Sequence, residues 1–470
     1  MQSNREGKLH KTDVLIVGGG PSGAASAMFL LAQGIQPVIV EPEPFPRYHI
    51  GESLTGEAGQ VVRALGLEAA MQQQRHPVKY GVTFYGPKGT SSWFVPVAAR
   101  DANWQLSPGA TWQVRRDEFD KLLLDEAVAR GATLLPGRAL KPIVEGGAVR
   151  GAQVAMRDGG VQTITSEVLL DCTGQASWLA NQRTVTGPKY LGAYDKQIAI
   201  FSQVTGAICD QGDTRETHGG NTLLFYRSKY HWAWFIPLDD ETVSVGLVMP
   251  AAYFRDKGES KRDFLVRELH EINPEMKRRL PEINLSEDVH VIPNYSFQVK
   301  NFCGKGFMCI GDAHRFVDPI FSFGLTGALR EAQFAAPSIA AYLNGAGRDL
   351  PNPFAHHQLF CEKGIDVMED VIDTFWEYPV AFGYCVQQRY PELMIDLFAG
   401  RVYEHEQQPS TVLQEFRKLL NRAQAREQSY AGDDLYSIPI GSRYHPERAP
   451  IWEAEASTGL TEAWMRAAAS

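Results

Sequence analysis

The sequence predicts an α/β protein, and three features carry this prediction. Residues 14–41 read as a strand, a glycine-rich turn, a helix and a second strand. Residues 180–290 contain strand-like runs that lack a helical period, which favours a central antiparallel sheet. Residues 354–425 are mostly helical in pattern. We therefore expect a β-α-β domain, a sheet domain and a helical C-terminal region.

The first of these segments contains Gly18, Gly20 and Gly23 in the spacing G-x-G-x-x-G, directly after the apolar residues 14–17. Gly18 permits a tight turn, Gly20 lets a pyrophosphate approach the backbone, and Gly23 lets the helix pack closely against the sheet. The free N–H groups and the dipole at the helix N-terminus stabilise an anion. This pattern predicts a Rossmann-like dinucleotide site.

Glu41 ends the second strand of this unit, after a helix pattern that Gly34 stops. An acid at this position can accept hydrogen bonds from both ribose hydroxyls of an adenosine. A lone glycine motif is weak support, but here strand, glycines, helix, strand and acid occur in register. A dinucleotide is therefore expected to bind, and at this point both NAD and FAD remain open.

Composition sets limits on the function. The chain has 470 residues with 44% hydrophobic and 21% charged residues, which allows two or three structural units. A net charge of −9 argues against nucleic acid or an anionic membrane as the main partner. No apolar run approaches the roughly 20 residues of a membrane span, and the polar start resembles no signal peptide. Six scattered cysteines without a C-x-x-C pair favour reduced thiols, a cytoplasmic location and no metal site.

The segment after Glu41 leaves two readings open. Arg47 and the turn at Gly51, Glu52 and Ser53 either face the ribityl or pyrophosphate part of the cofactor or form a surface loop. A helical pattern runs from about residue 57 to 74, and a strand covers residues 82–85. Residues 91–111 are aromatic and read as irregular.

Further along the chain, three elements return to the dinucleotide unit. A helix opens near Arg116, and a β-meander follows it with turns at residues 146–147 and 158–160. The meander ends in a buried strand, residues 168–171, followed by Cys172-Thr173-Gly174. A short strand near residue 307 precedes Gly311-Asp312-Ala313, and a helix runs from Gly324 to about residue 344.

These later motifs favour FAD over NAD. Gly311-Asp312-Ala313 after a strand resembles the second fingerprint of FAD proteins, in which the aspartate faces the ribityl chain. Together with Arg116-x-x-Phe-Asp120 and Asp171-x-Thr-Gly174, it resembles the p-hydroxybenzoate hydroxylase class of flavoproteins. This resemblance implies a discontinuous FAD-binding domain (10–80, 110–178 and 295–350), a substrate domain (81–109 and 179–294) and a helical region (351–470) covering the substrate site.

Two further motifs narrow the resemblance. Residues 232–237 contain W-x-W-x-I-P, and residues 316–324 contain F-x-x-P-x-x-S-x-G. By composition alone, two tryptophans on alternate positions of a strand are typical of a core. Both motifs in one FAD-binding chain, in this order, resemble the flavin-dependent halogenases, and the likeness covers most of residues 10–345.

The halogenase resemblance implies a reaction and a site. FADH2 and O2 form a flavin C4a-hydroperoxide, which oxidises chloride or bromide to hypohalous acid. The backbone of Phe323 and Gly324 would hold the halide in a dry nest of N–H donors. Trp232 and Trp234 would fill the space beside the flavin, so that the oxidant must travel to a second chamber.

In that chamber the family uses a lysine, and Lys79 in His-Pro-Val-Lys-Tyr-Gly is at the matching place. Outside this set of motifs, a single lysine is typical of a solvated surface. Its amine is suited either to donate a hydrogen bond to hypohalous acid or to become a haloamine. Burial would lower the pKa of the amine and favour the second route.

One departure from the family concerns the substrate. Tryptophan halogenases carry a glutamate immediately before the serine of the last motif, and here the residue is Phe321. Its absence disfavours tryptophan, whereas phenols and pyrroles are activated by their own heteroatom. The chain most resembles the phenol and pyrrole halogenases, several of which act on carrier-bound substrates. Four C-terminal aromatic residues either line the ring site or form core: Trp376, Tyr378, Phe382 and Tyr384.

We therefore expect an FAD-dependent halogenase of electron-rich aromatic rings that receives FADH2 from a separate flavin reductase. Two alternatives remain. One is an aromatic hydroxylase that reduces its own flavin with NAD(P)H, since hydroxylases of this class also lack a second glycine motif for the nicotinamide nucleotide. The other is a catalytically silent halogenase-like subunit.

Overall fold

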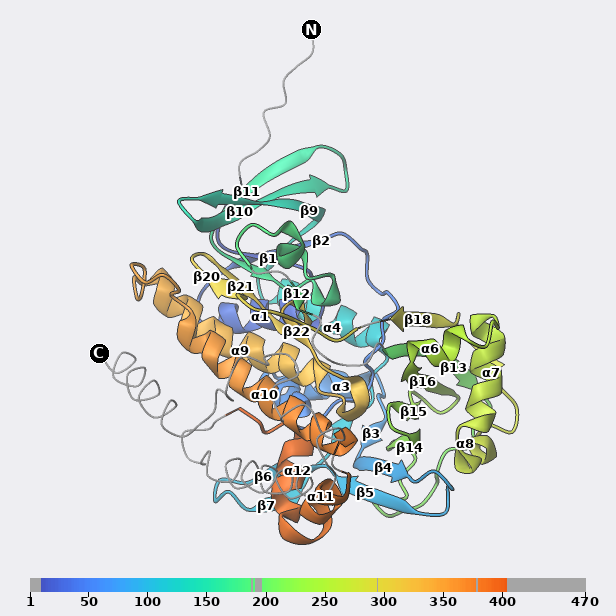
Figure 1. Ribbon diagram of the computed structural model, residues 1–470. Coiled ribbons are helices and arrows are strands. Elements are labelled where there is room, and N and C mark those ends of the chain that lie inside the picture. The colour runs from blue at the N-terminus through green and yellow to red at the C-terminus, as the bar shows by residue number, and fades with distance from the viewer. Residues whose placement is uncertain (1–9, 187–188, 191–196, 294, 378, 404–470) are drawn as a thin grey trace, which may run out of the picture.

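The computed structural model describes residues 10–186, 189–190, 197–293, 295–377 and 379–403. Figure 1 shows two large sheets, with long helices beside the first and shorter helices on the outer side of the second. The predicted α/β class, with its β-α-β unit and antiparallel sheet, is confirmed, and the C-terminal region is helical over the residues described up to 403. The rest of the predicted helical region, residues 404–470, lies outside the described residues. Among the residues described, no helix is long and apolar enough to cross a membrane.

The first sheet carries the dinucleotide unit. Its seven strands are β1 (His10–Val17), β2 (Pro37–Glu41), β9 (Thr133–Glu145), β10 (Ala148–Met156), β11 (Val161–Asp171), β20 (Cys303–Gly304) and β21 (Phe307–Cys309). β1 lies parallel to both β2 and β11, and β21 is parallel to β11. The outer parts of β9 and β11 pair antiparallel with β10, as the predicted meander requires.

Helices cover this sheet and form one core with it. They are α1 (Pro21–Ala32), α2 (Gly56–Ala64), α3 (Glu68–Gln73), α4 (Arg116–Ala129), α5 (Trp178–Gln182) and α9 (Gly324–Leu343). Val14, Leu15 and Ile16 are fully buried, which is expected for a parallel strand with both faces covered. The predicted single helix over residues 57–74 is instead α2 and α3, because Gly66 between them takes a φ of +74°.

The second sheet has eight strands: β4 (Gly81–Tyr85), β5 (Ser92–Pro96), β13 (Gln197–Thr205), β14 (Thr222–Ser228), β15 (His231–Pro237), β16 (Thr242–Pro250), β17 (Asn284–Leu285) and β18 (His290–Pro293). All pairings are antiparallel except β4 with β14. The prediction that residues 91–111 are irregular is wrong, because β5 pairs with β4 along its whole length.

The two faces of the second sheet differ. Along β15, Ala233 and Phe235 belong to a core that includes α7 (Lys261–Glu271) and α8 (Pro274–Arg279). Trp232 and Trp234 belong to a separate, aromatic core on the opposite face. A short helix, α6 (Ala251–Arg255), follows β16.

Short elements connect the large sheets. They are the strand pairs β3 (Val78–Lys79) with β8 (Thr111–Trp112) and β6 (Ala98–Arg100) with β7 (Leu106–Pro108), the sheet of β12 (Lys189–Tyr190), β19 (Phe297–Val299) and β22 (Arg315–Phe316), and the 3-10 turns η1 (Gly174–Ala176), η2 (Gly311–Ala313) and η3 (Pro319–Phe321). β3 places Lys79 at the end of the strand pair that leads into the second sheet.

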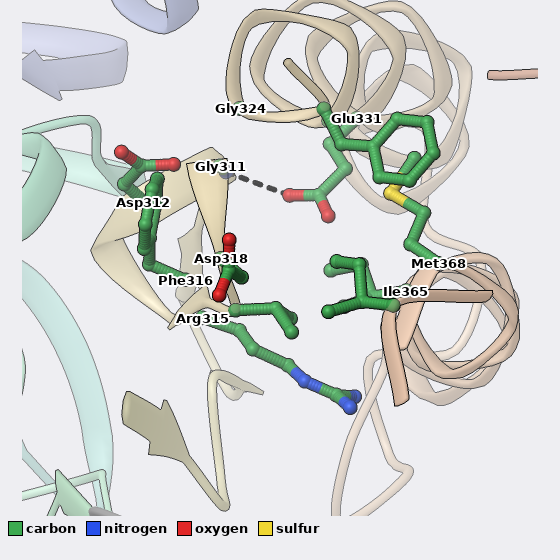
Figure 2. Close-up of a pocket in the computed structure, with 13 residues that line it drawn as sticks. Gly311, Asp312, Arg315, Phe316, Asp318, Gly324, Glu331, Ile365 and Met368 are labelled. Carbon is green, nitrogen blue, oxygen red and sulfur yellow. Dashed lines mark hydrogen bonds between the residues drawn. The ribbon is translucent and has the colours of Figure 1, made fainter. Parts of the chain in front are cut away.

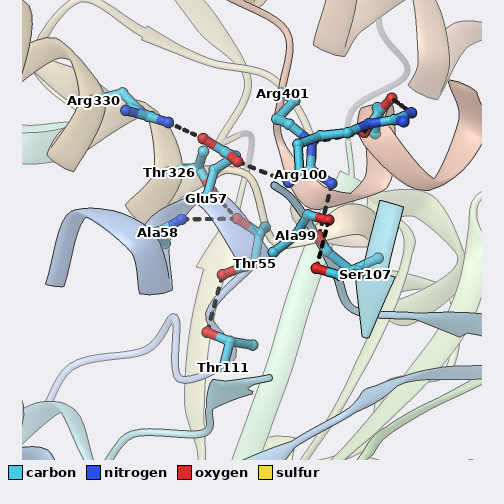
Figure 3. Close-up of polar contacts among 12 residues, drawn as sticks. Thr55, Glu57, Ala58, Ala99, Arg100, Ser107, Thr111, Thr326, Arg330 and Arg401 are labelled. Carbon is cyan, nitrogen blue, oxygen red and sulfur yellow. Dashed lines mark hydrogen bonds and ion pairs between the residues drawn. The ribbon is translucent and has the colours of Figure 1, made fainter. Parts of the chain in front are cut away.

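The C-terminal helices lie against α2 and α9. They are α10 (Ala355–Glu377), α11 (Pro379–Tyr384), the π-helical turn η4 (Cys385–Arg389) and α12 (Pro391–Ala399). Figure 3 shows the buried carboxylate of Glu57 on α2 paired with Arg330 of α9 and with Arg401, which follows α12. Arg401 also pairs with Asp396 at 2.7 Å. This network joins the helical region to the first domain.

Candidate active site

The glycine-rich loop has the geometry that its sequence predicts. Gly18 has a φ of +104°, and a Cβ atom there would lie 2.5 Å from the carbonyl oxygen of Cys172. A Cβ atom on Gly23 would lie 1.9 Å from the oxygen of Gly18. Only glycine fits at both positions. α1 therefore packs directly onto the turn, with its first N–H groups directed out of the loop.

The space above this loop suits an anion. No side chain caps the N-terminus of α1, and a Cβ atom on Gly20 would have no neighbour nearer than Arg47 Nη2 at 3.7 Å. Arg47 Nε is buried without a hydrogen-bond partner among the residues described. The Arg47 guanidinium also lies 3.7 Å from the carboxylate of Glu43. A helix terminus without a side-chain cap next to a guanidinium suits a pyrophosphate, so these residues fit the dinucleotide.

Glu41 closes the base of the loop. Its carboxylate is buried, with Oε2 accepting a hydrogen bond from Gly19 N–H at 2.7 Å and Oε1 accepting one from Glu43 N–H at 2.9 Å. The side chain thus orients the glycine loop as well as lying where an adenosine ribose is expected.

Arg116 and Asp312 come from distant segments to one side of this site. Arg116 is buried at the start of α4, pairs with Asp120 at 2.7 Å and donates to the carbonyl of Ile50 at 2.5 Å. Burial raises the pKa of Asp312 to about 7, and the charge of Arg116 opposes this shift. The two predicted cofactor residues are therefore near each other.

The turn that carries Asp312 is held from below by α9. Glu331 Oε2 accepts a hydrogen bond from Gly311 N–H at 2.6 Å, which Figure 2 shows, and it lies 2.9 Å from His314 Nε2. His314 stacks on Phe302 with 3.8 Å between ring centroids. Glu331 escapes sequence reasoning because it belongs to no motif and faces inward from the middle of a helix.

The start of α9 presents free backbone donors. Ser322 has a φ of +59°, and Phe323 is the N-cap residue without a side-chain hydrogen bond. The first N–H groups of a helix have no partner within it, so those of Phe323 and Gly324 are available. A Cβ atom on Gly324 would lie 3.8 Å from Asp312 Oδ1, which places this helix terminus beside the cofactor residues.

A cavity of about 30 Å³ opens at this helix terminus. It is lined by Asp312, Phe316, Asp318, Phe323, Gly324 and Glu331 and, from α10, by Ile365, Met368 and Ile372. In Figure 2 the segment of Asp312 and Asp318 lies opposite the apolar side chains of α10. Its volume suits one small ion or one to two waters.

Trp232 and Trp234 lie on β15 in one apolar cluster with Phe321 and Phe323. Both indoles are buried, and their ring centroids are 5.9 Å apart. A Cβ atom on Gly246 would lie 2.3 Å from the ring of Trp234, so this glycine makes room for the indole on the neighbouring strand. The tryptophan pair thus borders the segment that precedes α9.

Lys79 is fully enclosed, with 2% of its surface exposed. Its Nζ donates hydrogen bonds to Ser53 Oγ at 2.7 Å and to the carbonyl oxygen of Leu54 at 3.0 Å. Burial lowers the pKa of the amine to about 7, which confirms the expected direction. The hydroxyl of Ser53, one of the predicted cofactor residues, contacts Lys79 and Thr222.

The loop that holds Lys79 is also tied to α9. Thr55 Oγ1 lies 2.7 Å from Thr326 Oγ1, in the first turn of the helix that begins at Gly324. Figure 3 shows this contact beside the hydrogen bonds of Thr55 with Ala58 and Thr111. Hydrogen bonds therefore connect the loop that holds Lys79 to the first turn of α9.

Aromatic rings surround Phe321. Its centroid lies 4.9 Å from Phe398, 5.4 Å from Phe375 and 6.0 Å from Phe84. Of the C-terminal aromatic residues that the sequence suggests, Trp376 and Phe382 are buried, and Phe382 stacks parallel to Phe321. Tyr384 is 49% exposed and does not line an enclosed site, and Tyr378 is outside the residues described. Phe84 and Phe398 join this wall only through tertiary packing.

Comparison with known proteins gives the family. A family model described as an FAD binding domain matches residues 11–351. The 1H-pyrrole-2-carbonyl peptidyl-carrier protein brominase of Pseudoalteromonas luteoviolacea is 34% identical over 397 residues, which are 84% of this chain and 93% of that protein. The corresponding chlorinase of Pseudomonas fluorescens is 25% identical over 84% of this chain and 90% of its own length.

A solved structure agrees with these relatives. The flavin-dependent brominase Bmp2 superposes with a TM-score of 0.80 at 33% identity, over 88% of this chain and 100% of the brominase. The chain therefore belongs to the flavin-dependent halogenases, oxidoreductases that use FAD and a halide.

Proposed function

We propose that this halogenase transfers chlorine or bromine to a pyrrole ring presented by a peptidyl-carrier protein. The relatives named as a brominase and a chlorinase of that carrier-bound substrate support the substrate class. Phe321, in place of the glutamate of tryptophan halogenases, supports an activated ring that needs no added base. The buried amine of Lys79 is the observation that carries the reaction type.

FAD occupies the space that the glycine loop leaves open. We assign its pyrophosphate, ribose and ribityl contacts to Gly18, Gly20, Gly23, Glu41, Arg47, Arg116 and Asp312. The terminus of α1, which has no side-chain cap among the residues described, and the Arg47 guanidinium next to Gly20 support this assignment. As FADH2, the cofactor supplies the reduction of O2 that drives halide oxidation. A separate flavin reductase delivers it, as the resemblance to the flavin-dependent halogenases implies.

The halide is held at the N-terminus of α9 by the N–H groups of Phe323 and Gly324. The size of the adjoining cavity and the lack of a side-chain cap on this helix support that placement. Trp232 and Trp234 keep the aromatic ring away from the cofactor, so that only the small oxidant reaches Lys79. Their burial beside Phe323 supports this role.

Lys79 passes the halogen to the ring. A neutral amine has two N–H donors and one lone pair, and the two donors here have the acceptors Ser53 Oγ and Leu54 O. The lone pair is then left to attack hypohalous acid, which forms an N–halogen bond and releases water. The ring next takes the halogen, and its proton returns to the amine. A pKa of about 7 makes the neutral form available.

Mass spectrometry of the carrier-bound ring tests this function. Enzyme, flavin reductase, NADH, FAD and chloride or bromide are incubated with pyrrolyl-carrier protein, free pyrrole-2-carboxylate and a simple phenol. Only the carrier-bound pyrrole should gain halogen, and only with halide and reductase present. Halogenation of the phenol alone would overturn the substrate, and hydroxylation without the reductase would favour the hydroxylase alternative. No turnover despite bound FAD would indicate a silent subunit.

A further inference from the structure

The loop of residues 52–54 directs consecutive groups to two different parts of the site. Ser53 and the carbonyl of Leu54 hold Lys79. The preceding residue, Glu52, directs its side chain the other way, towards the second sheet. Only 2% of Glu52 is exposed, and Oε2 has no hydrogen-bond partner among the residues described. Burying a carboxyl group costs free energy unless hydrogen-bond donors surround it, so the groups next to Glu52 are of interest.

Two neighbouring strands supply those partners. Gln203 Nε2 on β13 donates to Glu52 Oε1 at 3.3 Å. Ser244 on β16 faces Gln203 across the β13–β16 pairing, so its hydroxyl lies on the same face as the carboxylate and favours the charged form of Glu52. The carboxylate therefore lies beside the paired residues Gln203 of β13 and Ser244 of β16.

Ser244 connects Glu52 to the tryptophan pair. Its Oγ accepts a hydrogen bond from Trp234 Nε1–H at 3.1 Å. Since a serine hydroxyl has one hydrogen, Ser244 can accept from the indole and donate to the carboxylate at the same time. Gly246 lies two residues after Ser244, on the same face of β16, and leaves the space that the indole of Trp234 fills. The ring of Trp234 is thus held at its N–H and over its face.

We propose that Glu52 is a positioning residue for Trp234: through Ser244 it holds the indole while its neighbours Ser53 and Leu54 hold Lys79. The loop of residues 52–54 thereby fixes the positions of both the Trp234 indole and the Lys79 amine. The proposal rests on the proposed function, in which Trp234 separates the cofactor from Lys79. If the indole of Trp234 were free to move, water would reach the hypohalous acid, and less of the oxidised halogen would be transferred to the ring.

The charge of Glu52 determines whether this chain of hydrogen bonds is intact. Burial raises the pKa of Glu52 to about 7, against the hydrogen bonds of Ser244 and Gln203 and the charges of Arg116 and Arg115. Tyr48 also faces Glu52, and Glu287 lies on its other side. Above pH 7 the anion accepts from Ser244. Below pH 7 the acid is neutral and one of its oxygens is a donor, so the carboxyl group is a weaker acceptor for the Ser244 hydroxyl.

NMR of the indole N–H group of Trp234 tests the positioning directly. The protein contains nine tryptophans, so 15N-indole labelling gives few signals, and Trp234→Phe identifies the relevant one. In the parent its shift should titrate with a midpoint near pH 7. The titration should vanish in Glu52→Gln. It should persist in Lys79→Met, which removes the Lys79 amine, another group with a pKa of about 7 in this part of the site. A titration that survives Glu52→Gln, or is absent from the parent, would overturn the proposal.

Coupling of the reaction gives a second readout. At pH 8, Glu52→Gln and Ser244→Ala should each lower the product formed per FADH2 oxidised by about threefold to tenfold, the loss expected for one hydrogen bond. The double variant should lose little more than the single ones, because both break one chain. Glu167→Gln, which removes a carboxylate from the Arg150 pair on the β10–β11 hairpin, should have no effect. Fully additive losses would refute the shared chain.

The two readouts separate this proposal from the proposed function. If the parent halogenates nothing, the function fails, yet the indole titration still decides whether Glu52 positions Trp234. If Glu52→Gln fails to fold or to bind FAD, Ser244→Ala carries the test, since it removes only one hydroxyl. A Ser244→Ala variant with parental coupling and an unmoved Trp234 signal would overturn the proposal.

Discussion

The glycine loop and the surroundings of Lys79 are built in opposite ways. The loop is one continuous stretch, residues 14–41, and it depends on close backbone approaches, Gly18 against Cys172 and Gly23 against Gly18. One side chain of the same stretch, the Glu41 carboxylate, accepts a hydrogen bond from the Gly19 N–H. Lys79, by contrast, is held by the side chain of Ser53 and the carbonyl of Leu54, which belong to a separate loop.

This difference teaches that cofactor binding and use of the oxidant depend on separate sets of contacts. A backbone-built loop depends on a few glycines, and a change there alters binding of the dinucleotide. A chamber assembled from side chains can lose one functional group while the cofactor site stays intact. Substitutions in the two regions should therefore give different kinetic signatures, and four predictions follow from this contrast.

The largest effect is expected for Lys79→Met, which removes the amine and retains an apolar stem. Product formation should fall at least about 100-fold, as for loss of a group that acts directly in the chemical step. FAD affinity and halide oxidation should stay within about twofold, because no contact of Lys79 reaches the glycine loop. Halogenated product and trapped hypohalous acid are measured together.

Lys79→Arg is the matched variant for this prediction. It keeps a positive charge and hydrogen-bond donors but cannot lose a proton to form a haloamine. If it is as inactive as Lys79→Met, the haloamine route is supported. Substantial activity in the arginine variant would indicate hydrogen-bond donation instead. Normal product from the methionine variant would contradict any role of Lys79 in transfer.

The same contrast explains what the sequence could predict. Gly18, Gly23 and the helix after Gly324 depend on local spacing and backbone conformation, which a linear pattern records. Lys79 was found through family motifs, whereas its burial depends on tertiary contacts. Ser53 was associated with the cofactor because it follows the turn at Gly51, but its side chain direction is set by packing against Thr222, far along the chain.

The residues that sequence reasoning missed share one property. Ser244 and Glu331 act through partners that lie far away in sequence, across strands or between a helix and a turn. The turn of Glu52 is a candidate from the sequence, but the contact of Glu52 with Gln203 of the second sheet is not. Only Gly246 left a trace, because a glycine inside an apolar strand indicates close approach of another group. The strand β5 was likewise hidden, since its pairing with β4 is visible only in the fold.

The second prediction concerns the halide, which lies between the two regions. Gly324→Pro removes one N–H donor and should raise the half-saturating halide concentration about tenfold or more, since hydrogen bonds to charged groups are strong. Gly324→Ala keeps the donor, and its Cβ atom would have 3.6 Å to Phe316, so it should behave as the parent. FAD affinity checks the fold, because proline disfavours the conformation of Phe323. If both variants had the same half-saturating halide concentration, the halide would not bind at the N-terminus of α9.

The third prediction lies in the glycine loop. Glu41→Ala should weaken FAD binding about tenfold, because it removes the acceptor for the ribose and leaves the Gly19 N–H without its partner. Product formed per FADH2 oxidised at saturating FAD should be unchanged. Fluorescence titration with FAD gives the affinity. Parental affinity in this variant would mean that the adenosine end is misplaced.

The smallest effect is expected from pH in the parent enzyme. Because burial lowers the pKa of Lys79 to about 7, the neutral amine predominates at pH 8 and makes up half of the population at pH 7. Transfer through a haloamine should therefore roughly halve between pH 8 and pH 7, relative to halide oxidised. Glu52→Gln separates the two groups that titrate here: the fall should persist in that variant, in which the lysine still titrates. If the fall in transfer disappears in Glu52→Gln, it arises from the titration of Glu52 and not from that of Lys79. If transfer increases at lower pH, the charged ammonium of Lys79, which donates a hydrogen bond, is the favoured form.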